Sequence, residues 1–93
     1  MSEAPPLVSV VIVNYKVPFY LHQTVRSLKH TQLYERSEVI VVDNASRDTS
    51  RDDIARDFPA VQWIELKDNV GFGKACNVGA RHARGMLSLT TTT

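Results

Sequence analysis

The chain has 93 residues, of which 43% are hydrophobic and 23% are charged, so it can hold one globular core and hardly two. Its eleven basic and ten acidic residues leave a net charge of +1, far from the basic excess that draws a protein onto nucleic acid or anionic lipid. Cys76 is the only cysteine, which excludes an internal disulfide and favours a reducing compartment. We therefore expect a cytoplasmic domain with no nucleic-acid partner.

The first predicted strand is the β-branched run from Leu7 to Val13, which follows an expected tail at residues 1–6. This run is typical of a strand buried on both faces, and it is too short to cross a bilayer. After Pro18 the apolar residues take the spacing of an amphipathic helix that we expect to end near His30. The residues at this spacing are Leu21, Val25 and Leu28.

Two further strands and a short helix are predicted in the middle of the chain. Residues 39–42 form an all-apolar, β-branched run that predicts a second buried strand. Residues 50–58 carry the start and stop signals of a short helix. Residues 61–66 predict a third strand, and the polar Gln62 and Glu65 indicate that it lies at an edge of the sheet.

A third helix is predicted from residue 74 to about residue 84, with Gly85 as its C-terminal stop. Residues 86–89 begin like a fourth strand, and the threonine run at residues 90–93 is expected to be an irregular tail. Strands and helices thus alternate. This order predicts an α/β fold, a Rossmann-like parallel sheet with flanking helices, within residues 7–89.

Polar clusters follow three of the predicted strands, where ligands bind in open parallel sheets. They are Asn14-Tyr15-Lys16, Asp43-Asn44-Ala45-Ser46 and the segment from Asn69 to Asn77. The ring of Tyr15 suits a nucleoside base, and the carboxylate of Asp43 can accept a hydrogen bond from a base or a ribose hydroxyl. The alternative is that the side chains of Asp43 and Asn44 bond their own turn, as such residues often do.

Several other kinds of site are excluded or disfavoured. The turn from Asn14 to Pro18 has no glycine, which disfavours a nicotinamide enzyme and a methyltransferase-like domain. The chain has neither a P-loop motif nor a GxSxG motif. None of its three histidines lies at a metal-ligand spacing to a carboxylate or thiol, and Cys76 is expected to be a small core residue. No catalytic residue and no metal ligand is therefore predicted.

Three segments together closely resemble the family 2 glycosyltransferases of the GT-A fold, in particular the rhamnosyltransferase-type branch. They are Val8 to Tyr15, Glu38 to Ser46 and Asn69 to Gly79. The resemblance runs from about Val8 to Gly85, and the combination of VDNAS with NVGFGKACNVG makes it specific. It implies that the chain is the N-terminal, nucleotide-binding part of a GT-A fold.

The resemblance also implies an activity and a set of site residues. Such enzymes transfer a sugar, with inversion, from a nucleoside diphosphate donor to an acceptor hydroxyl, here a glycan or a lipid-linked acceptor. Tyr15 and Asp43 would hold the nucleotide, and the segment before the third helix would shape the donor site. The expected nucleotide-sugar-binding residues are Asn14, Tyr15, Asp43, Asn44, Asn69, Gly71, Gly73 and Asn77.

The chain departs from the family pattern after Gly85. Family members hold Mg²⁺ or Mn²⁺ through an Asp-x-Asp type motif after the fourth strand, and a later carboxylate takes the acceptor proton. Here Ser88-Leu89 and four threonines stand in that place, so neither the metal motif nor the base is expected in the chain. We therefore expect a truncated fragment that is inactive alone.

The alternative to a truncated transferase is a noncatalytic nucleotide-binding or interaction module. A partial sheet exposes an unpaired edge, which predicts self-association of the fragment. In a longer parent protein we expect a location at the inner face of the membrane.

Overall fold

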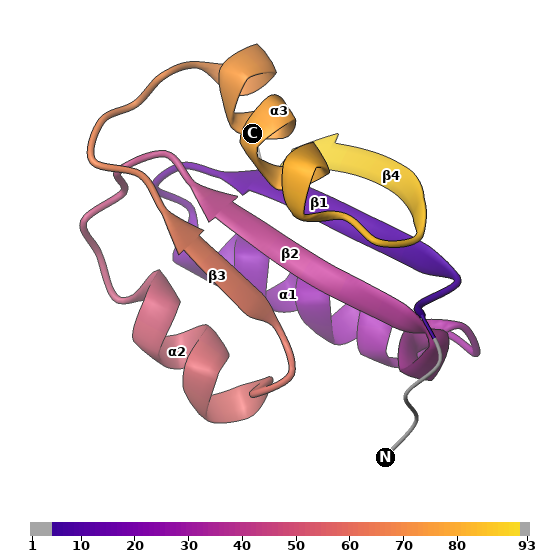
Figure 1. Ribbon diagram of the computed structural model, residues 1–93. Helices are drawn as coiled ribbons and strands as arrows, with labels where there is room; N and C mark the ends of the chain where they lie inside the picture. The colour runs from indigo at the N-terminus through magenta and orange to yellow at the C-terminus, as the bar shows by residue number, and fades with distance from the viewer. Residues whose placement is uncertain (1–4, 92–93) are drawn as a thin grey trace.

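The computed structural model describes residues 5–91, which form a parallel sheet with helices on both faces (Figure 1). The strands are β1 (Val8–Asn14), β2 (Ser37–Asp43), β3 (Gln62–Glu65) and β4 (Met86–Thr91). The helices are α1 (Pro18–Lys29), α2 (Ser50–Asp57) and α3 (Phe72–His82), with a short 3-10 helix η1 (Tyr34–Arg36) before β2. The predicted α/β fold with a Rossmann-like parallel sheet is confirmed.

The two faces of the sheet carry separate apolar cores, because successive side chains of a strand point to opposite faces. On the face covered by α1 and α2 the buried residues are Ile12, Leu21, Val25, Val39, Val41, Ile54 and Phe58. On the face covered by α3 they are Val11, Val13, Ile40, Val42, Ala75 and Cys76. The continuous β-branched runs of β1 and β2 supply both cores, as expected for strands buried on both sides.

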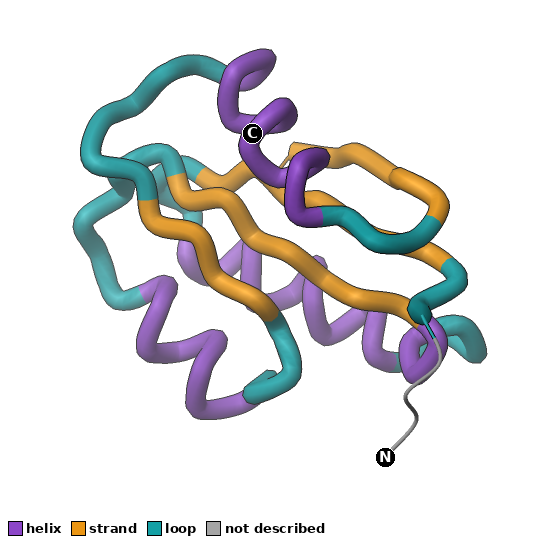
Figure 2. Tube along the Cα trace, in the orientation of Figure 1, coloured by secondary structure: helices purple, strands orange, loops and turns teal. Residues whose placement is uncertain are grey.

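The strand order is β3-β2-β1-β4, and every pairing in it is parallel. The chain adds β2 and β3 on one side of β1 and then returns to add β4 on the other side. In this register Asn14 lies opposite Asp43, and Val13 lies opposite Thr91. The carboxyl ends of the strands therefore meet at one edge of the sheet, from which the loops to the helices leave (Figure 2).

The fourth strand is longer than predicted. Thr90 and Thr91, expected in an irregular tail, continue β4 and pair with Ile12 and Val13 of β1. The pairing needs only backbone groups, and the β-branched threonine suits a strand, so a threonine run can extend the ladder. The remainder of the two predicted tails, residues 1–4 and 92–93, lies outside the described residues.

The third helix also differs from its prediction, because it begins at Phe72 and ends at His82. Gly71 has a φ of 85° and turns the chain into the helix two residues earlier than the expected start at Lys74. The predicted edge position of β3 is confirmed, since it ends the strand order and its Gln62 and Glu65 are exposed. Within residues 5–91, no helix has the length and apolar character needed to cross a bilayer.

Candidate functional site

A cavity of about 220 Å³ lies at the carboxyl edge of the sheet, at the ends of β1 and β4 and beside the start of α3. Its lining residues are Val13, Tyr15, Asn44, Asn69, Gly71, Phe72 and Thr91. The strand order reverses between β1 and β4, and open α/β sheets bind ligands at such a switch point. The cavity is smaller than the roughly 300–1,000 Å³ of a complete ligand pocket, which fits a partial site.

Asp43 lies buried behind this cavity at the end of β2, with 2% of its surface exposed. Its Oδ1 accepts hydrogen bonds from the Asn14 side chain at 2.9 Å and from the Ser46 hydroxyl at 2.6 Å. Its Oδ2 accepts a bond from the Ser46 backbone N–H at 3.0 Å. The carboxylate therefore bonds its own turn, the alternative that the sequence had left open, and ties that turn to β1.

Ser46 connects this carboxylate to the loop that carries Tyr15. Its hydroxyl oxygen accepts a hydrogen bond of 2.8 Å from the backbone N–H of Lys16. The ammonium of Lys16 lies 5.2 Å from the centre of the Tyr15 ring, within the range of a cation–π contact. An aromatic ring that lines the cavity thus has an exposed positive charge beside it.

Three residues in these two loops have left-handed backbone conformations although none is glycine. The φ angles are 53° at Lys16, 62° at Ala45 and 55° at Arg47. Each such conformation costs on the order of 1–3 kcal/mol and persists only where surrounding contacts hold it, as is common at functional sites. The hydrogen bonds of Ser46 and the bond from the Arg47 side chain to the carbonyl of Lys67, 2.9 Å long, hold the loops here.

Asn44 fixes the loop before α3 in the way that a backbone pairing would. Its Oδ1 accepts a bond from the N–H of Val70 at 3.2 Å, and its Nδ2 donates to the carbonyl of Gly71 at 3.3 Å. The N–H of Gly71 in turn donates to Oδ1 of Asn69 at 2.9 Å. The N-terminus of α3, with its partial positive charge, is thereby held beside the cavity.

The eight predicted site residues fall into three groups. Four of them line the cavity: Tyr15, Asn44, Asn69 and Gly71. Asn14 and Asp43 are buried next to it and bond each other. Gly73 and Asn77 are exposed on α3 and do not line the cavity.

The eight expected site residues omit four that shape the site: Val13, Ser46, Phe72 and Thr91. Ser46 could have been found from its position three residues after Asp43, a spacing at which a side chain commonly bonds a following backbone N–H. Phe72 lines the cavity and lies within the segment from Asn69 to Asn77 that the sequence had singled out. Thr91 also lines the cavity but could not be predicted from its own segment, because only the tertiary fold brings β4 beside Tyr15.

The described residues do not offer a metal site at this edge. No group of three or more His, Cys, Asp or Glu that could hold a metal ion occurs within residues 5–91. No described residue that lines the cavity is acidic, and both oxygens of Asp43 already accept hydrogen bonds. Cys76 is a residue of α3 whose thiol packs in the core between this helix and the sheet. Burial raises the pKa of this thiol, so Cys76 is not an activated nucleophile.

Comparisons with known proteins agree with this arrangement. The chain is 31% identical over 77 residues to an uncharacterized glycosyltransferase of Haemophilus influenzae, and 34% identical over 80 residues to the uncharacterized glycosyltransferase YfnE of Bacillus subtilis. These matches cover 80% and 83% of this chain but only 24% and 20% of the relatives. The chain thus spans about a quarter or less of their length.

Solved structures give the same result. The mannosyltransferase PcManGT of Pyrobaculum calidifontis, solved with GDP-Man and Mn²⁺, superposes with a TM-score of 0.84 at 25% identity, covering 97% of this chain and 28% of its own. Residues 1–349 of TarS from S. aureus, in complex with UDP-GlcNAc, give a TM-score of 0.82 at 25% identity and cover 92% and 26%. The profile of glycosyl transferase family 2 matches residues 9–90. The chain therefore belongs to glycosyl transferase family 2.

Proposed function

We propose that this chain forms the donor-binding part of a glycosyltransferase that moves a sugar from a nucleoside diphosphate to an acceptor hydroxyl. The observation that carries the proposal is the cavity at the switch point, which is lined by Tyr15 and by Gly71 and Phe72 at the start of α3. The exposed ammonium of Lys16 lies outside this lining, next to the Tyr15 ring. The ring offers a face for the base, while the ammonium and the helix end favour the negative diphosphate. Two similar structures contain nucleotide sugars, GDP-Man and UDP-GlcNAc.

The finer features of the reaction belong to a longer parent protein. In that protein we expect inversion at the sugar and a glycan or lipid-linked acceptor, and the rhamnosyltransferase-type branch stays a prediction. A divalent metal, present as Mn²⁺ in the PcManGT complex, offsets the charge of the departing diphosphate when it is bound. The described residues of this chain supply no ligand set for it.

A second candidate, a noncatalytic nucleotide-binding module, is favoured by the composition of the cavity. Among residues 5–91, none that lines the cavity is acidic, so none of these can act as a carboxylate base toward an acceptor hydroxyl. The module predicts nucleotide binding without transfer or hydrolysis of the sugar. Release of nucleoside diphosphate from UDP-GlcNAc or GDP-Man by the purified chain would contradict it.

The proposed location and self-association rest on separate observations. Cys76 is a free, buried thiol, which supports a cytoplasmic location. β4 ends the strand order and so has a neighbouring strand on one side only within the described sheet, which supports association with a second copy of the chain.

The test is an amide NMR titration of the chain with UDP, GDP or dTDP in the presence of Mg²⁺. We expect shifts of the peaks of Tyr15, Asn44 and Asn69. Tyr15→Ala should weaken binding by about tenfold or more, because stacking on a base contributes about 1–3 kcal/mol. The matched control is Tyr20→Ala, since Tyr20 is exposed on α1 and outside the cavity. Absence of shifts with every nucleotide would refute donor binding by this chain.

A further inference from the structure

The side chains of β4 carry little information about how the strand should align on β1. Residues 86–90 are all exposed, and apolar residues occur on both faces of the strand, as Met86, Leu87 and Leu89 show. A strand's register is strongly specified only where one of its faces is buried. The position of β4 must therefore be set by contacts outside the strand.

The register of β4 matters because it decides which side chain reaches the donor cavity. In the observed register Thr91 lines that cavity, whereas Ser88 and Thr90 line a groove against α1 on the other face. A slip of one residue would exchange the two faces, because the side-chain period of a strand is two. Position 91 would then be lost from the cavity.

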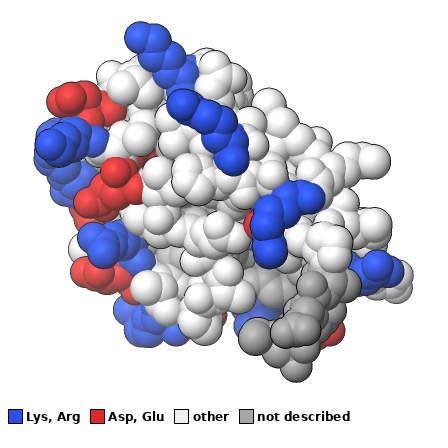
Figure 3. All heavy atoms as spheres, viewed as in Figure 1, with Lys and Arg blue, Asp and Glu red and all other residues white. Residues whose placement is uncertain are grey.

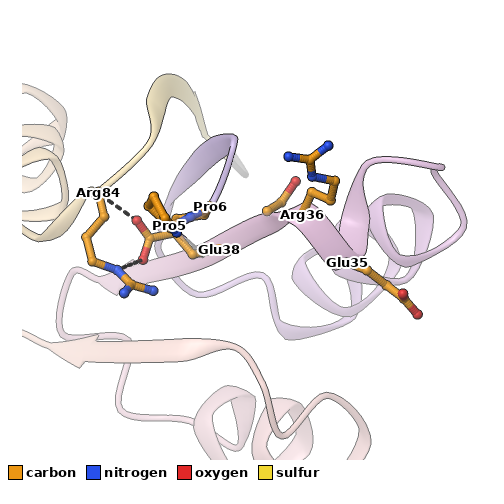
Figure 4. A pocket seen from close by; sticks show the side chains of 7 residues that line it. Pro5, Pro6, Glu35, Arg36, Glu38 and Arg84 are labelled. Atoms are coloured by element: carbon orange, nitrogen blue, oxygen red, sulfur yellow. Dashed lines mark hydrogen bonds and ion pairs between the residues drawn. The ribbon is translucent and has the colours of Figure 1, made fainter. Parts of the chain in front are cut away.

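A hydrogen-bonded cluster at the opposite, amino edge of the sheet grips the turn that leads into β4. We name it the amino-edge clasp, formed by Ser9, Glu38, Arg84 and Gly85. Figure 4 shows two of its members, Glu38 and Arg84, with the bonds between them. Oε2 of Glu38 accepts bonds from the Ser9 hydroxyl at 2.5 Å and from the backbone N–H of Arg84 at 2.6 Å. The N–H of Gly85 donates to the Ser9 hydroxyl at 2.8 Å.

The other carboxylate oxygen of Glu38 completes the clasp. Oε1 accepts a bond from the Gln62 side chain of β3 at 3.0 Å and faces Nε of Arg84 at 3.4 Å. Glu38 lies on β2, opposite Ser9 of β1. One carboxylate therefore contacts β1, β3 and the turn before β4 from its place on β2.

The centre of the clasp is the buried carboxylate of Glu38, and both of its oxygens accept hydrogen bonds. The side chain of Glu38 is 5% exposed. Burial alone would raise the pKa of its carboxyl, but the bonds from Ser9, Arg84 and Gln62 together hold that pKa below its usual range. The charged, hydrogen-bonded form therefore persists at neutral pH.

Close packing at Gly85 leaves the turn no freedom to slide. A Cβ at this position would lie 2.6 Å from the carbonyl oxygen of Pro6, and the next N–H, that of Met86, donates to the carbonyl of Leu7 at 3.1 Å. The start of the ladder between β4 and β1 is thus held by the packing of Gly85 against Pro6 and by the bond from Met86 to Leu7.

We propose that the amino-edge clasp sets the register of β4 on β1, with Glu38 as the positioning residue for the side chain at the far end of the strand. A change of register would remove Thr91 from the donor cavity and so lower nucleotide affinity, and this consequence rests on the donor-binding function proposed above. The proposal about the register itself does not depend on that function.

The register is tested by NMR on the chain without nucleotide, comparing the wild type with Glu38→Gln and Ser9→Ala. The probes are cross-strand contacts between Ser9 or its replacement and Leu87 and between Val11 and Leu89, which are partners in the ladder. In both variants we expect these contacts to disappear or to be joined by a second set that reports a shifted register. The amide hydrogens of β4 should exchange with solvent about tenfold faster or more, while the contacts between β1 and β2 remain. The matched control is Glu35→Gln, an exposed glutamate of η1 that lines a surface cavity together with Glu38 and Arg84 but takes no part in the clasp (Figure 4).

Two results would overturn the proposal. One is a wild-type set of β1–β4 contacts in both variants. The other is equal loss of protection in all four strands or failure of both variants to fold, which would make the clasp a general stabilising element. A titration with UDP, GDP and dTDP then separates the two proposals. If the wild type binds a nucleotide and the two variants bind it more weakly, the register of β4 affects nucleotide affinity at the donor cavity. No binding by the wild type would refute the donor function alone.

Discussion

The backbone at Gly71 has a φ of 85° and a ψ of 169°, a region open almost only to glycine. We predict that Gly71→Ala destabilises the fold by about 1–3 kcal/mol through backbone strain, although a Cβ there would meet no atom within 4 Å. The control is Gly73→Ala, two residues on, where a Cβ also meets nothing and alanine favours the helix by roughly 1 kcal/mol. Urea unfolding of both variants checks this. Equal stability of the two variants would contradict the strain argument.

Ser46 holds two loops at once, because its hydroxyl donates to Asp43 and accepts from Lys16. We predict that Ser46→Ala costs about 1–3 kcal/mol, since it leaves buried polar groups without a partner. The amide peaks of Tyr15 and Lys16 should also move. Urea unfolding and an amide NMR spectrum test the two effects, with the exposed Ser27→Ala as the control. A spectrum unchanged around Tyr15 would show that Ser46 does not position this loop.

Helix α3 packs closely on the sheet at Gly79. A Cβ there would lie 2.3 Å from a methyl carbon of Val11 and 3.0 Å from one of Val42. We predict that Gly79→Ala destabilises by about 1–3 kcal/mol through overpacking, although alanine favours a helix. Gly73→Ala in the same helix provides the control, and urea unfolding gives both values. A stabilised Gly79→Ala variant would mean that α3 can move away from the sheet without loss.

Helices α1 and α2 are joined by a hydrogen bond in which Nε2 of His22 lies 2.7 Å from Oδ2 of Asp57. Hydrogen bonds from Arg56 and then from His22 lower the pKa of Asp57 to about 2. An unfolded aspartate has a pKa of about 3.9, so the folded state binds its proton less readily. The stabilising contribution of the ionised Asp57 carboxylate is therefore complete above about pH 4 and is lost as the pH falls toward 2.

We accordingly predict that Asp57→Asn flattens the fall in stability between about pH 4 and pH 2. The pKa of Glu38 is also lowered, so its stabilising contribution to the fold is lost in the same acid range. The fall in stability should therefore become smaller in Asp57→Asn without disappearing. Urea midpoints measured across this range test the prediction, and the exposed Asp68→Asn serves as the control. Since Asp57 is on the surface, the difference should also shrink at high salt. The same slope in Asp57→Asn and wild type would count against it.

At the scale of the molecule, charge is distributed unevenly over the surface. In the view of Figure 3, residues of both signs gather on the side of α2, while the region over β4 is largely uncharged. β4 contains no charged residue, and its Met86, Leu87 and Leu89 are exposed. Natural edge strands usually carry charges that prevent pairing with a second copy.

We therefore predict association that increases with protein concentration and that Leu89→Lys reduces, because a lysine on β4 would oppose edge pairing. Sedimentation velocity over a series of concentrations measures it. Leu33→Lys is the control, since Leu33 is also exposed but precedes η1, away from the edge. A wild-type chain that stays monomeric throughout the series would rule out the association.

The sequence predicts the fold well because its information is local. The β-branched runs of β1 and β2 and the helical spacing in α1 are visible within their own segments. Within the candidate site, the carboxyl-edge position of Tyr15 and Asn44 follows from the same runs. The burial of Asp43 does not follow, because spacing alone cannot show whether a carboxylate faces a ligand or bonds its own turn. Thr91 enters the cavity only through pairing across 78 positions of sequence, from Val13 to Thr91.

That long pairing has a consequence for how the protein is made. Synthesis proceeds from the N-terminus, so β1, β2 and β3 are complete before β4 exists. Until then one edge of the central strand β1 has no partner, although β1 supplies residues to both cores. An unpaired, apolar edge of this kind is the surface through which nascent chains associate. The emerging chain should therefore be most in need of chaperone protection in the interval before Met86 to Thr91 are added.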